Sequence, residues 1–292
     1  MGELIRSDGI IPGDRFYIDD EDLSCYISAT TWLKQELPTP KELILWQAEK
    51  GKWFVNKTLF ETSTYGTIVH DLCEIYLLKR EINVGFVNDF IEAHIKKAGL
   101  SYKFQEWRYE VYNDLICFQH MCRQVNLEPL KTEERLRLRL DTFGGLAGTF
   151  DLFCELDYYK KRKLAILDFK TTRKGFWKSN EYQLHLYRHM FVNKYSMFTK
   201  GEILLFNWHP KDFRKEMPTY NLQSQASNDI EAELMLYIEI AKIKKPWVLN
   251  KRFKEFEKLS FDETSKWKTK LGYEIVGGKE RITKKWLGNG KK

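Results

Sequence analysis

The stretch Leu164-Ala-Ile-Leu-Asp-Phe-Lys170 decides how this chain of 292 residues folds. Its run of apolar residues, followed by polar ones, predicts a buried strand. Side chains two apart in a strand share a face, so Asp168 and Lys170 project together at the strand's end. An acid and a lysine there are unusual for a purely structural element, although an acid-any-Lys pattern alone arises by chance about once or twice in a chain of this length.

A second strand is predicted over residues 147–156, and the polar tip Asp157-Tyr-Tyr-Lys-Lys-Arg162 between the two strands indicates an antiparallel hairpin. Residues that face each other across a hairpin share one face of the sheet, so an even-numbered loop puts Asp151 beside Asp168 or Lys170. Two close carboxylates repel each other unless a cation lies between them, and oxygen ligands suit Mg²⁺ or Mn²⁺. The alternative is a surface Asp151 and a simple Asp168–Lys170 ion pair.

The rest of the chain indicates an α/β protein with a helical N-terminal part. Helices are predicted over residues 41–51, 66–79, 86–98 and 105–125, and a strand begins at Glu134, where leucines alternate with arginines. A helix at 181–192, a strand at 202–208 and a helix at 228–243 follow the hairpin. We therefore expect a central mixed sheet flanked by helices over residues 1–240, and a basic, aromatic-rich segment over 241–292.

The positive charge of the chain is concentrated at its end. The formal net charge is +7, yet residues 241–292 alone carry an excess of ten positive charges, which leaves −3 for the rest. Lys242, Lys244 and Lys245, called here the C-terminal lysine cluster, open this segment, and aromatic residues such as Trp247 are interleaved with its lysines. Lysines on phosphates and aromatics on bases hold single-stranded DNA without sequence preference. Aromatics packed on the core below solvated lysines are the alternative.

Composition also excludes several classes of protein. The five cysteines are scattered, without the spacing of a zinc or iron-sulfur site. No apolar run is long enough to cross a bilayer, and the N-terminus lacks the apolar region of a signal peptide. These features predict a cytoplasmic protein that does not contact a membrane.

Four segments together resemble a known family. Their order in the chain is Gly66-Thr-Ile-Val-His70, Gly148-Thr-Phe-Asp151, Ile166-Leu-Asp-Phe-Lys-Thr-Thr172 and Tyr182-Gln-Leu-His-Leu-Tyr187. They are similar to the motifs of the PD-(D/E)XK nucleases, in the RecB-type exonuclease branch that includes phage and mitochondrial genome maintenance exonucleases. The resemblance covers residues 28–191 and implies the PD-(D/E)XK nuclease core.

The resemblance implies roles for the residues that match its motifs. Asp151, Asp168 and the backbone carbonyl of Phe169 would bind one or two Mg²⁺ or Mn²⁺ ions, with His70 as a further ligand. Lys170 would assist hydrolysis by orienting or deprotonating water, or by neutralising charge that develops on phosphorus.

Further residues are implied at the rim of this centre. Gln183 and Tyr187 would border the site and touch the scissile strand, although an ordinary amphipathic helix face is the alternative for Tyr187. Glu134 resembles the acid that precedes the central sheet, whereas Glu74 is interpreted as supporting the site. The implied DNA contacts are Ser28 and Thr30, in the opening motif Ile27-Ser-Ala-Thr-Thr-Trp32, together with Thr171 and Thr172.

Two departures qualify the resemblance. Phe150 stands where the family label has a proline, which the RecB-type branch often lacks. No cysteine follows Cys154, so the C-terminal cluster of iron-sulfur relatives cannot form.

The expected activity is metal-dependent exonuclease digestion of DNA with free ends or single strands. An endonuclease of the same fold, which would cut closed circles, and a DNA-binding protein without catalysis are the alternatives.

Overall fold

The computed structural model describes residues 3–8, 14–79, 81–171, 177–210, 220–224 and 228–248, and the strands 273–276 and 279–282. Two compact units are interleaved along the chain. One comprises residues 1–36, 137–148 and 235–292, and the other comprises residues 37–136 and 149–234. The predicted boundary at residue 240 falls inside a continuous helix, Asn228–Lys244.

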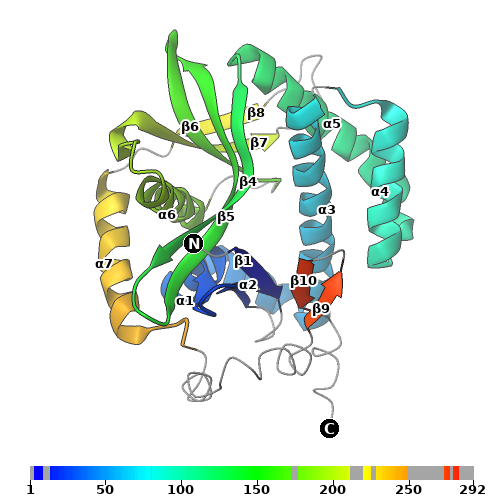
Figure 1. Cartoon of the computed structure of the whole chain (residues 1–292). Coiled ribbons are helices and arrows are strands. Elements are labelled where there is room, and N and C mark those ends of the chain that lie inside the picture. The colour runs from blue at the N-terminus through cyan, green and yellow to red at the C-terminus, as the bar shows by residue number, and fades with distance from the viewer. Residues whose placement is uncertain are drawn as a thin grey trace. The chain divides into compact units, whose positions relative to one another are not determined.

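The second unit holds most of the described helices (Figure 1), and those from α2 to α5 follow one another closely along the chain. They are α2 (Lys41–Lys50), α3 (Lys52–Lys79), α4 (Val84–Ala98), the short η1 (Ser101–Lys103), α5 (Phe104–Gln124), α6 (Lys178–Lys194), the short η2 (Lys200–Glu202) and part of α7 (Asn228–Lys244). Local signals set their ends: Asn83 accepts a hydrogen bond from the Phe86 amide at 2.8 Å, and Gly99 ends α4 with a φ of 72°. All the predicted helices are present.

Helix α3 begins earlier than the sequence indicated, at Lys52 instead of Gly66. The reason is that Trp53, Phe54, Leu59 and Phe60 in its first turns are exposed, so these turns lack the buried stripe from which helices were predicted. Gly66 lies in the middle of α3, at a point where Thr171 packs closely against the helix. A Cβ at Gly66 would stand 3.3 Å from the Thr171 Oγ1.

Eight of the described strands form one mixed sheet with the order β1-β2-β3-β5-β6-β7-β8, and β4 pairs with β5. They are β1 (Leu4–Asp8), β2 (Arg15–Asp19), β3 (Cys25–Ser28), β4 (Glu128–Arg139), β5 (Gly144–Tyr158), β6 (Lys161–Phe169), β7 (Ile203–Pro210) and β8 (Tyr220–Ser224). Strand β6 runs antiparallel to β5 and parallel to β7. Two further strands, β9 (Tyr273–Val276) and β10 (Lys279–Ile282), pair with each other.

The predicted hairpin is β5–β6. Its turn is Tyr159–Lys160, both with positive φ (47° and 60°), as a two-residue hairpin turn of type I′ requires. The even-numbered loop sets the register, in which Leu152 pairs with Leu167. That register brings Asp151 and Asp168 to the same end of the hairpin.

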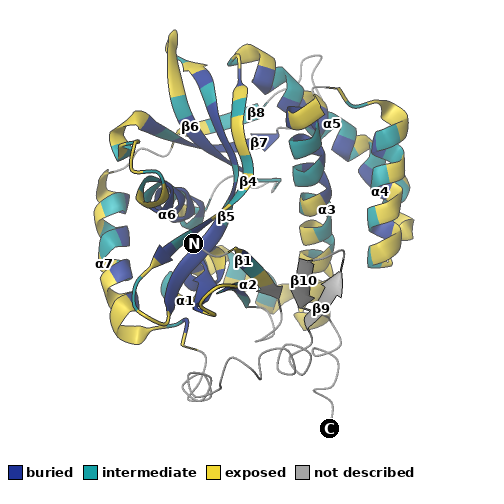
Figure 2. Cartoon of the chain, in the orientation of Figure 1, coloured by how far each residue is buried: buried dark blue, intermediate teal, exposed yellow. Residues whose placement is uncertain are grey.

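One hydrophobic core joins the helices to a face of the sheet. Residues of α3, α4 and α5 pack on Leu152, Leu167, Phe169, Phe206 and Trp208. Figure 2 shows the buried residues concentrated in the central strands and along one side of these helices. Because side chains alternate in a strand, the residues between these positions face the opposite side, which α6 covers.

The first unit contains β1–β3, α1 (Ala29–Glu36) and the turn that leads into β5. At that turn Gly144, with a φ of 153°, lies so close to the Cys25 carbonyl that a Cβ would come within 1.7 Å of it. The Trp247 side chain is 1% exposed and donates its Nε1–H to Asp141 at 3.0 Å. For Trp247, therefore, the packing alternative is the one observed.

None of the described helices is long and apolar enough to span a membrane. All five cysteines are buried, and none of them forms a disulfide bond.

Candidate metal centre

Two carboxylates meet where the β5–β6 hairpin ends. The Asp151 Oδ2 accepts the Phe169 backbone N–H at 2.5 Å, so the backbone of β6 fixes this carboxylate. Asp168 is 2% exposed, and the Lys170 ammonium lies 2.5 Å from its Oδ2. The predicted convergence of Asp151, Asp168 and Lys170 is therefore observed.

Helix α3 brings a histidine to the same place. The His70 Nδ1 lies 3.4 Å from the Asp151 Oδ1, and the imidazole contacts the Phe169 ring edge-on with centroids 5.7 Å apart. Phe169 is itself held between the Phe118 and Trp208 rings of the core. The predicted role of the Phe169 carbonyl as a metal ligand stays a prediction.

A fourth candidate metal ligand, after Asp151, Asp168 and His70, is Glu133 of β4. One ligand atom each from His70, Glu133 and Asp151 lie within 4.8 Å of one another. Glu133 has a φ of 46°, a left-handed conformation that costs a residue with a Cβ about 1–2 kcal/mol. Backbone strain of this kind often marks functional sites.

The expectation that Glu134 supplies this acid is thus corrected by one residue. Its carboxylate instead lies 2.5 Å from the Lys194 ammonium, accepts a hydrogen bond from the Tyr195 hydroxyl, and lies 3.5 Å from the Lys131 ammonium. Neighbouring residues of a strand point to opposite faces, so one of the two glutamates turns away from the site. Glu134 lies two residues before Leu136 and therefore shares a strand face with this buried leucine, whereas Glu133 does not. This two-residue period was a sequence signal that the two glutamates face opposite ways.

Glu74, one helical turn after His70, contacts the strand that carries Glu133. It accepts a hydrogen bond from the Thr132 hydroxyl at 2.7 Å, and Thr132 precedes Glu133 in β4. The supporting role expected for Glu74 therefore has a physical basis, because it ties α3 to the strand that carries Glu133.

The electrostatics of the group favour a bound cation. Desolvation by the surrounding protein and the Asp151 charge raise the pKa of Glu133 to about 8, although solvent still reaches part of this side chain. Burial also raises the pKa of Asp168 to about 6, although Lys170 opposes this shift. The pKa of Asp151 is lowered, because His70 and Lys170 outweigh the effect of its burial. Crowded carboxylates that resist ionisation are stabilised by a divalent cation.

The donors also fit the kind of ion that the sequence predicted. Carboxylate oxygens suit Mg²⁺ and Mn²⁺, and an imidazole nitrogen is a common additional ligand of transition metals such as Mn²⁺. His70, Glu133, Asp151 and Asp168 are the residues that would hold it.

Lys170 is held from two sides. Besides its contact with Asp168, its ammonium donates to the Gln183 Oε1 at 3.1 Å, and the Gln183 Nε2 donates to the Tyr187 hydroxyl at 2.8 Å. Gln183 is 8% exposed and Tyr187 3% exposed. Lys170, Gln183 and Tyr187 thus form a chain of hydrogen bonds from the site into α6, so the bond to Gln183 ties Tyr187 to the site.

The predicted DNA-binding residues lie in different settings. Thr171 follows Lys170 directly and faces Gly66 of α3, and Thr172 lies outside the described residues. Ser28 is 2% exposed and caps α1 by accepting the Thr31 N–H at 3.1 Å, whereas Thr30 is exposed. Contact of these residues with DNA stays a prediction.

The C-terminal lysine cluster pairs with acids of its own unit. Lys242 lies 2.6 Å from Glu239, Lys244 lies 2.8 Å from Glu36, and Lys245 lies 3.1 Å from Asp141. All three side chains keep 44–55% of their surface exposed. They remain accessible to a polyanion, and their predicted role stays open to test.

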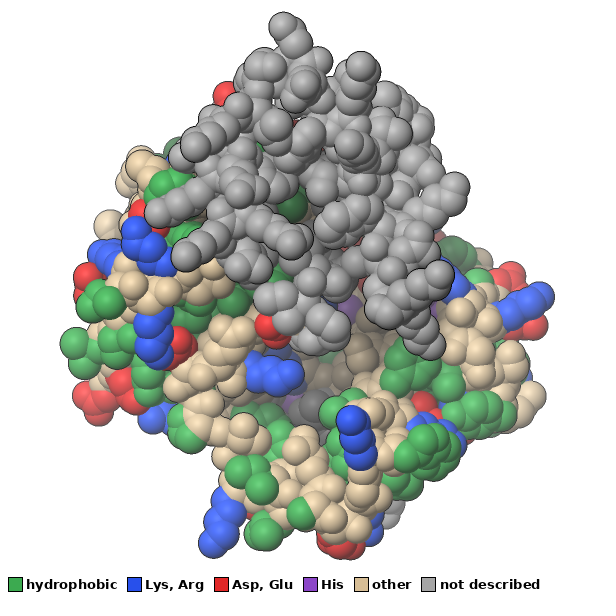
Figure 3. Space-filling view, turned by 90° about the horizontal axis from the view of Figure 1, so that it is seen from below, with side chains coloured by type: hydrophobic (Ala, Val, Ile, Leu, Met, Phe, Trp, Pro, Cys, Tyr) green, Lys and Arg blue, Asp and Glu red, His purple; other side chains and the backbone are tan. Residues whose placement is uncertain are grey.

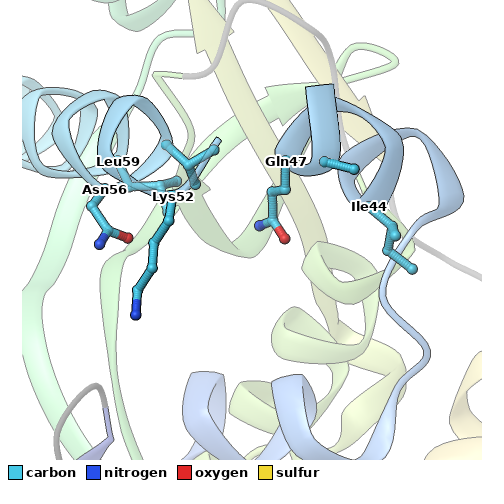
Figure 4. A pocket seen from close by; sticks show the side chains of 7 residues that line it. Ile44, Gln47, Lys52, Asn56 and Leu59 are labelled. Atoms are coloured by element: carbon cyan, nitrogen blue, oxygen red, sulfur yellow. The ribbon is translucent and has the colours of Figure 1, made fainter. Parts of the chain in front are cut away.

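A groove between α2 and α3 differs in chemistry from the candidate centre. Its lining includes Ile44, Gln47, Lys52, Asn56 and Leu59, whose side chains Figure 4 shows. None of its lining residues is an acid, histidine or cysteine, so it offers no strong metal ligand. On the face shown in Figure 3, the described basic, acidic and hydrophobic side chains are interspersed.

Comparison with known proteins gives little further information. No protein-family model and no curated protein matches the chain. A solved structure titled "Crystal structure of SSO0001" aligns with 60% of this chain and 84% of its own, at 14% identity and a TM-score of 0.27. The protein is an α/β protein with N-terminal helices and a central mixed sheet of eight strands flanked by helices.

Proposed function

We propose that this chain is a Mg²⁺- or Mn²⁺-dependent deoxyribonuclease with the PD-(D/E)XK nuclease core. The observation that carries the proposal is the group of ligand atoms from His70, Glu133 and Asp151 within 4.8 Å, next to the Asp168–Lys170 pair. A histidine, three carboxylates and one lysine at the end of a hairpin match both the chemistry and the order of the family's motifs.

The residues of the chain divide the work of hydrolysis. A cation held by the carboxylates and His70 would supply positive charge for the negative charge that develops on the phosphate. Lys170 is the lysine of the group and lies against Asp168, where its ammonium can orient the attacking water. Gln183 and Tyr187 hold that ammonium in place through their hydrogen bonds.

Lys170 is also preorganised for this role. It forms an ion pair with Asp168 and donates a hydrogen bond to Gln183, so its position is fixed before a substrate arrives. A preorganised charge stabilises a transition state without being rearranged during the reaction. This is the reason to prefer a catalytic to a purely structural role for the Asp168–Lys170 pair.

The substrate we propose is DNA with free ends or single strands, digested by an exonuclease in replication, recombination or DNA processing in the cytoplasm. The excess of ten positive charges over residues 241–292 supports a polyanionic substrate. The complete set of catalytic side chains argues against a binding protein that has lost catalysis.

The test is digestion of three substrates, with and without Mg²⁺: linear single-stranded DNA, linear duplex labelled at either end, and closed circular duplex. Asp168→Asn, which keeps the side-chain shape, serves as the control for contaminating nucleases. Metal-dependent loss of the linear substrates alone supports the exonuclease. Cutting of closed circles by the parent assigns an endonuclease of the same fold, and no cleavage of any substrate by the parent refutes the nuclease.

A further inference from the structure

Asn207 of β7 is a buried side chain that lacks partners. It is 0% exposed, and among the described residues neither its Oδ1 nor its Nδ2 has a hydrogen-bond partner. Nearly all buried polar atoms in folded proteins are hydrogen-bonded, and leaving them unbonded is unfavourable. An amide kept under these conditions therefore indicates a hydrogen-bond partner that it reaches in another state of the protein.

The register of the sheet places Asn207 beside the candidate metal centre. Strands β6 and β7 are parallel, and Asp168 is the residue of β6 that pairs with Asn207. Neighbours in register lie on one face of a sheet, with their strands about 4.8 Å apart. The flanking residues Leu167, Phe169, Phe206 and Trp208 all belong to the core on the other face. Asn207 and Asp168 thus share the face that α6 covers.

We propose that Asn207 is a positioning residue for Asp168, to which its Nδ2–H donates a hydrogen bond when a divalent cation is bound. This inference rests on the proposed function. Among the described residues, Lys170 is the group that holds the Asp168 Oδ2, at 2.5 Å. A bound cation would share the Asp168 charge and weaken that ion pair, whereas the hydrogen bond to Gln183 would keep Lys170 in place.

A neutral amide suits this task better than a second cationic side chain. It orients the carboxylate through a hydrogen bond and adds no positive charge that would repel the metal. Groups that orient a metal ligand in this way are a regular part of metal sites. Asp168 would keep its orientation even where the cation weakens its ion pair with Lys170.

The test compares Mn²⁺ binding and stability in the full chain. Mn²⁺ affinity is measured by electron paramagnetic resonance, and stability by urea unfolding without metal. The variants are Asn207→Leu, of similar size without polar atoms, and Asn207→Ser, which keeps a donor. Leu205→Ala is the matched control, because Leu205 is 1% exposed and lies two residues earlier on the same face of β7.

We expect Asn207→Leu to weaken Mn²⁺ binding by about 10–100-fold, the usual cost of losing a group that orients a ligand. Its unfolding midpoint should equal or exceed that of the parent, since no polar atom is left unbonded. Asn207→Ser should bind Mn²⁺ with intermediate affinity. Leu205→Ala should lower the midpoint and keep the parent's affinity.

An unchanged Mn²⁺ affinity in Asn207→Leu overturns the inference. If that unchanged affinity comes with an unfolding midpoint below the parent's, as in the Leu205→Ala control, Asn207 holds a buried structural water instead. A parent that binds no Mn²⁺ refutes the nuclease proposal itself, and the two failures are therefore distinguished by the parent alone.

Discussion

Replacing Glu133 by glutamine should stabilise the metal-free protein and impair the metal-bound one. The ligand atoms of Glu133 and Asp151 lie within 4.8 Å. Two unit charges at 4.8 Å repel by about 0.9 kcal/mol at a dielectric constant of about 80 and by about 3.5 kcal/mol at about 20. Solvent reaches the Glu133 side chain and screens both this repulsion and the shift of its pKa, so the lower value applies. We expect a gain of about 1 kcal/mol in the free energy of unfolding.

The gain depends on pH in a defined direction. The pKa of Glu133 is raised from 4.5 to about 8 in the folded protein, so folding favours its neutral form. Ionisation of this carboxyl therefore destabilises the folded state as the pH rises above 4.5. Glutamine is always neutral. The difference between variant and parent should therefore be absent below pH 4.5 and grow to its full size as the pH rises above that value.

The assay is urea unfolding of the parent, Glu133→Gln and the neighbouring control Glu134→Gln, over a pH series without metal and then with Mg²⁺. Adding Mg²⁺ should raise the midpoint of the parent more than that of Glu133→Gln. Glu134→Gln should be less stable than the parent wherever Glu134 is ionised in the parent, since the variant loses the ion pair with Lys194 and the charged acceptor of the Tyr195 hydroxyl. Its response to Mg²⁺ should equal that of the parent. A Mg²⁺ response that is lost in Glu134→Gln and kept in Glu133→Gln would refute the assignment of the site acid.

Four further predictions concern other parts of the molecule. Lys170→Ala should abolish DNA cleavage while circular dichroism and DNA binding stay near those of the parent; near-normal turnover would remove the lysine from the mechanism. His70→Ala should raise the Mg²⁺ concentration needed for half-maximal cleavage, and in the parent Ca²⁺ should support DNA binding with little cleavage, because its coordination geometry is looser. Changing all three residues of the C-terminal lysine cluster to glutamine should lower the salt slope of single-stranded DNA affinity by about 0.7 for each phosphate that is no longer neutralised, and superimposable slopes would show that the cluster does not touch DNA. Glu231→Gln should lower the free energy of unfolding by about 1–3 kcal/mol near neutral pH, since Glu231 bonds the buried His185; its pKa is lowered chiefly by that bond, so the parent should lose the difference as the pH falls below 4.5.

The sequence predicted the hairpin and the carboxylates at its end because both depend on local pattern. Alternation located β5 and β6, and the even-numbered loop fixed which side chains share a face. The helices of the second unit were predicted for the same reason. Strands β1–β3 were missed, since each is only 4–5 residues long and gives a weak periodic signal.

The parts of the site that were missed depend on conformation or on distant pairing. Glu133 reaches the site because its backbone is left-handed in the middle of β4, and a glutamate in the sequence does not predict that conformation. Asn207 lies beside Asp168 only because β7 pairs in parallel with β6, after an intervening helix, and that register cannot be read from either strand alone. Trp247 was equally compatible with stacking on DNA and with packing, and only its burial and its hydrogen bond to Asp141 distinguish the two.

The most direct test of the proposed metal centre is Mg²⁺-dependent cleavage of end-labelled linear DNA by the parent and by Asp151→Asn, which keeps the side-chain shape and removes the charge that faces His70. Both proteins are first shown to be folded by circular dichroism and by their unfolding midpoints. We expect the parent to cleave only with Mg²⁺ or Mn²⁺, to stop when EDTA is added, and to lose all cleavage in Asp151→Asn. Cleavage by the parent that EDTA does not affect, or an Asp151→Asn variant that cleaves at the parent's rate, would contradict the metal-dependent nuclease.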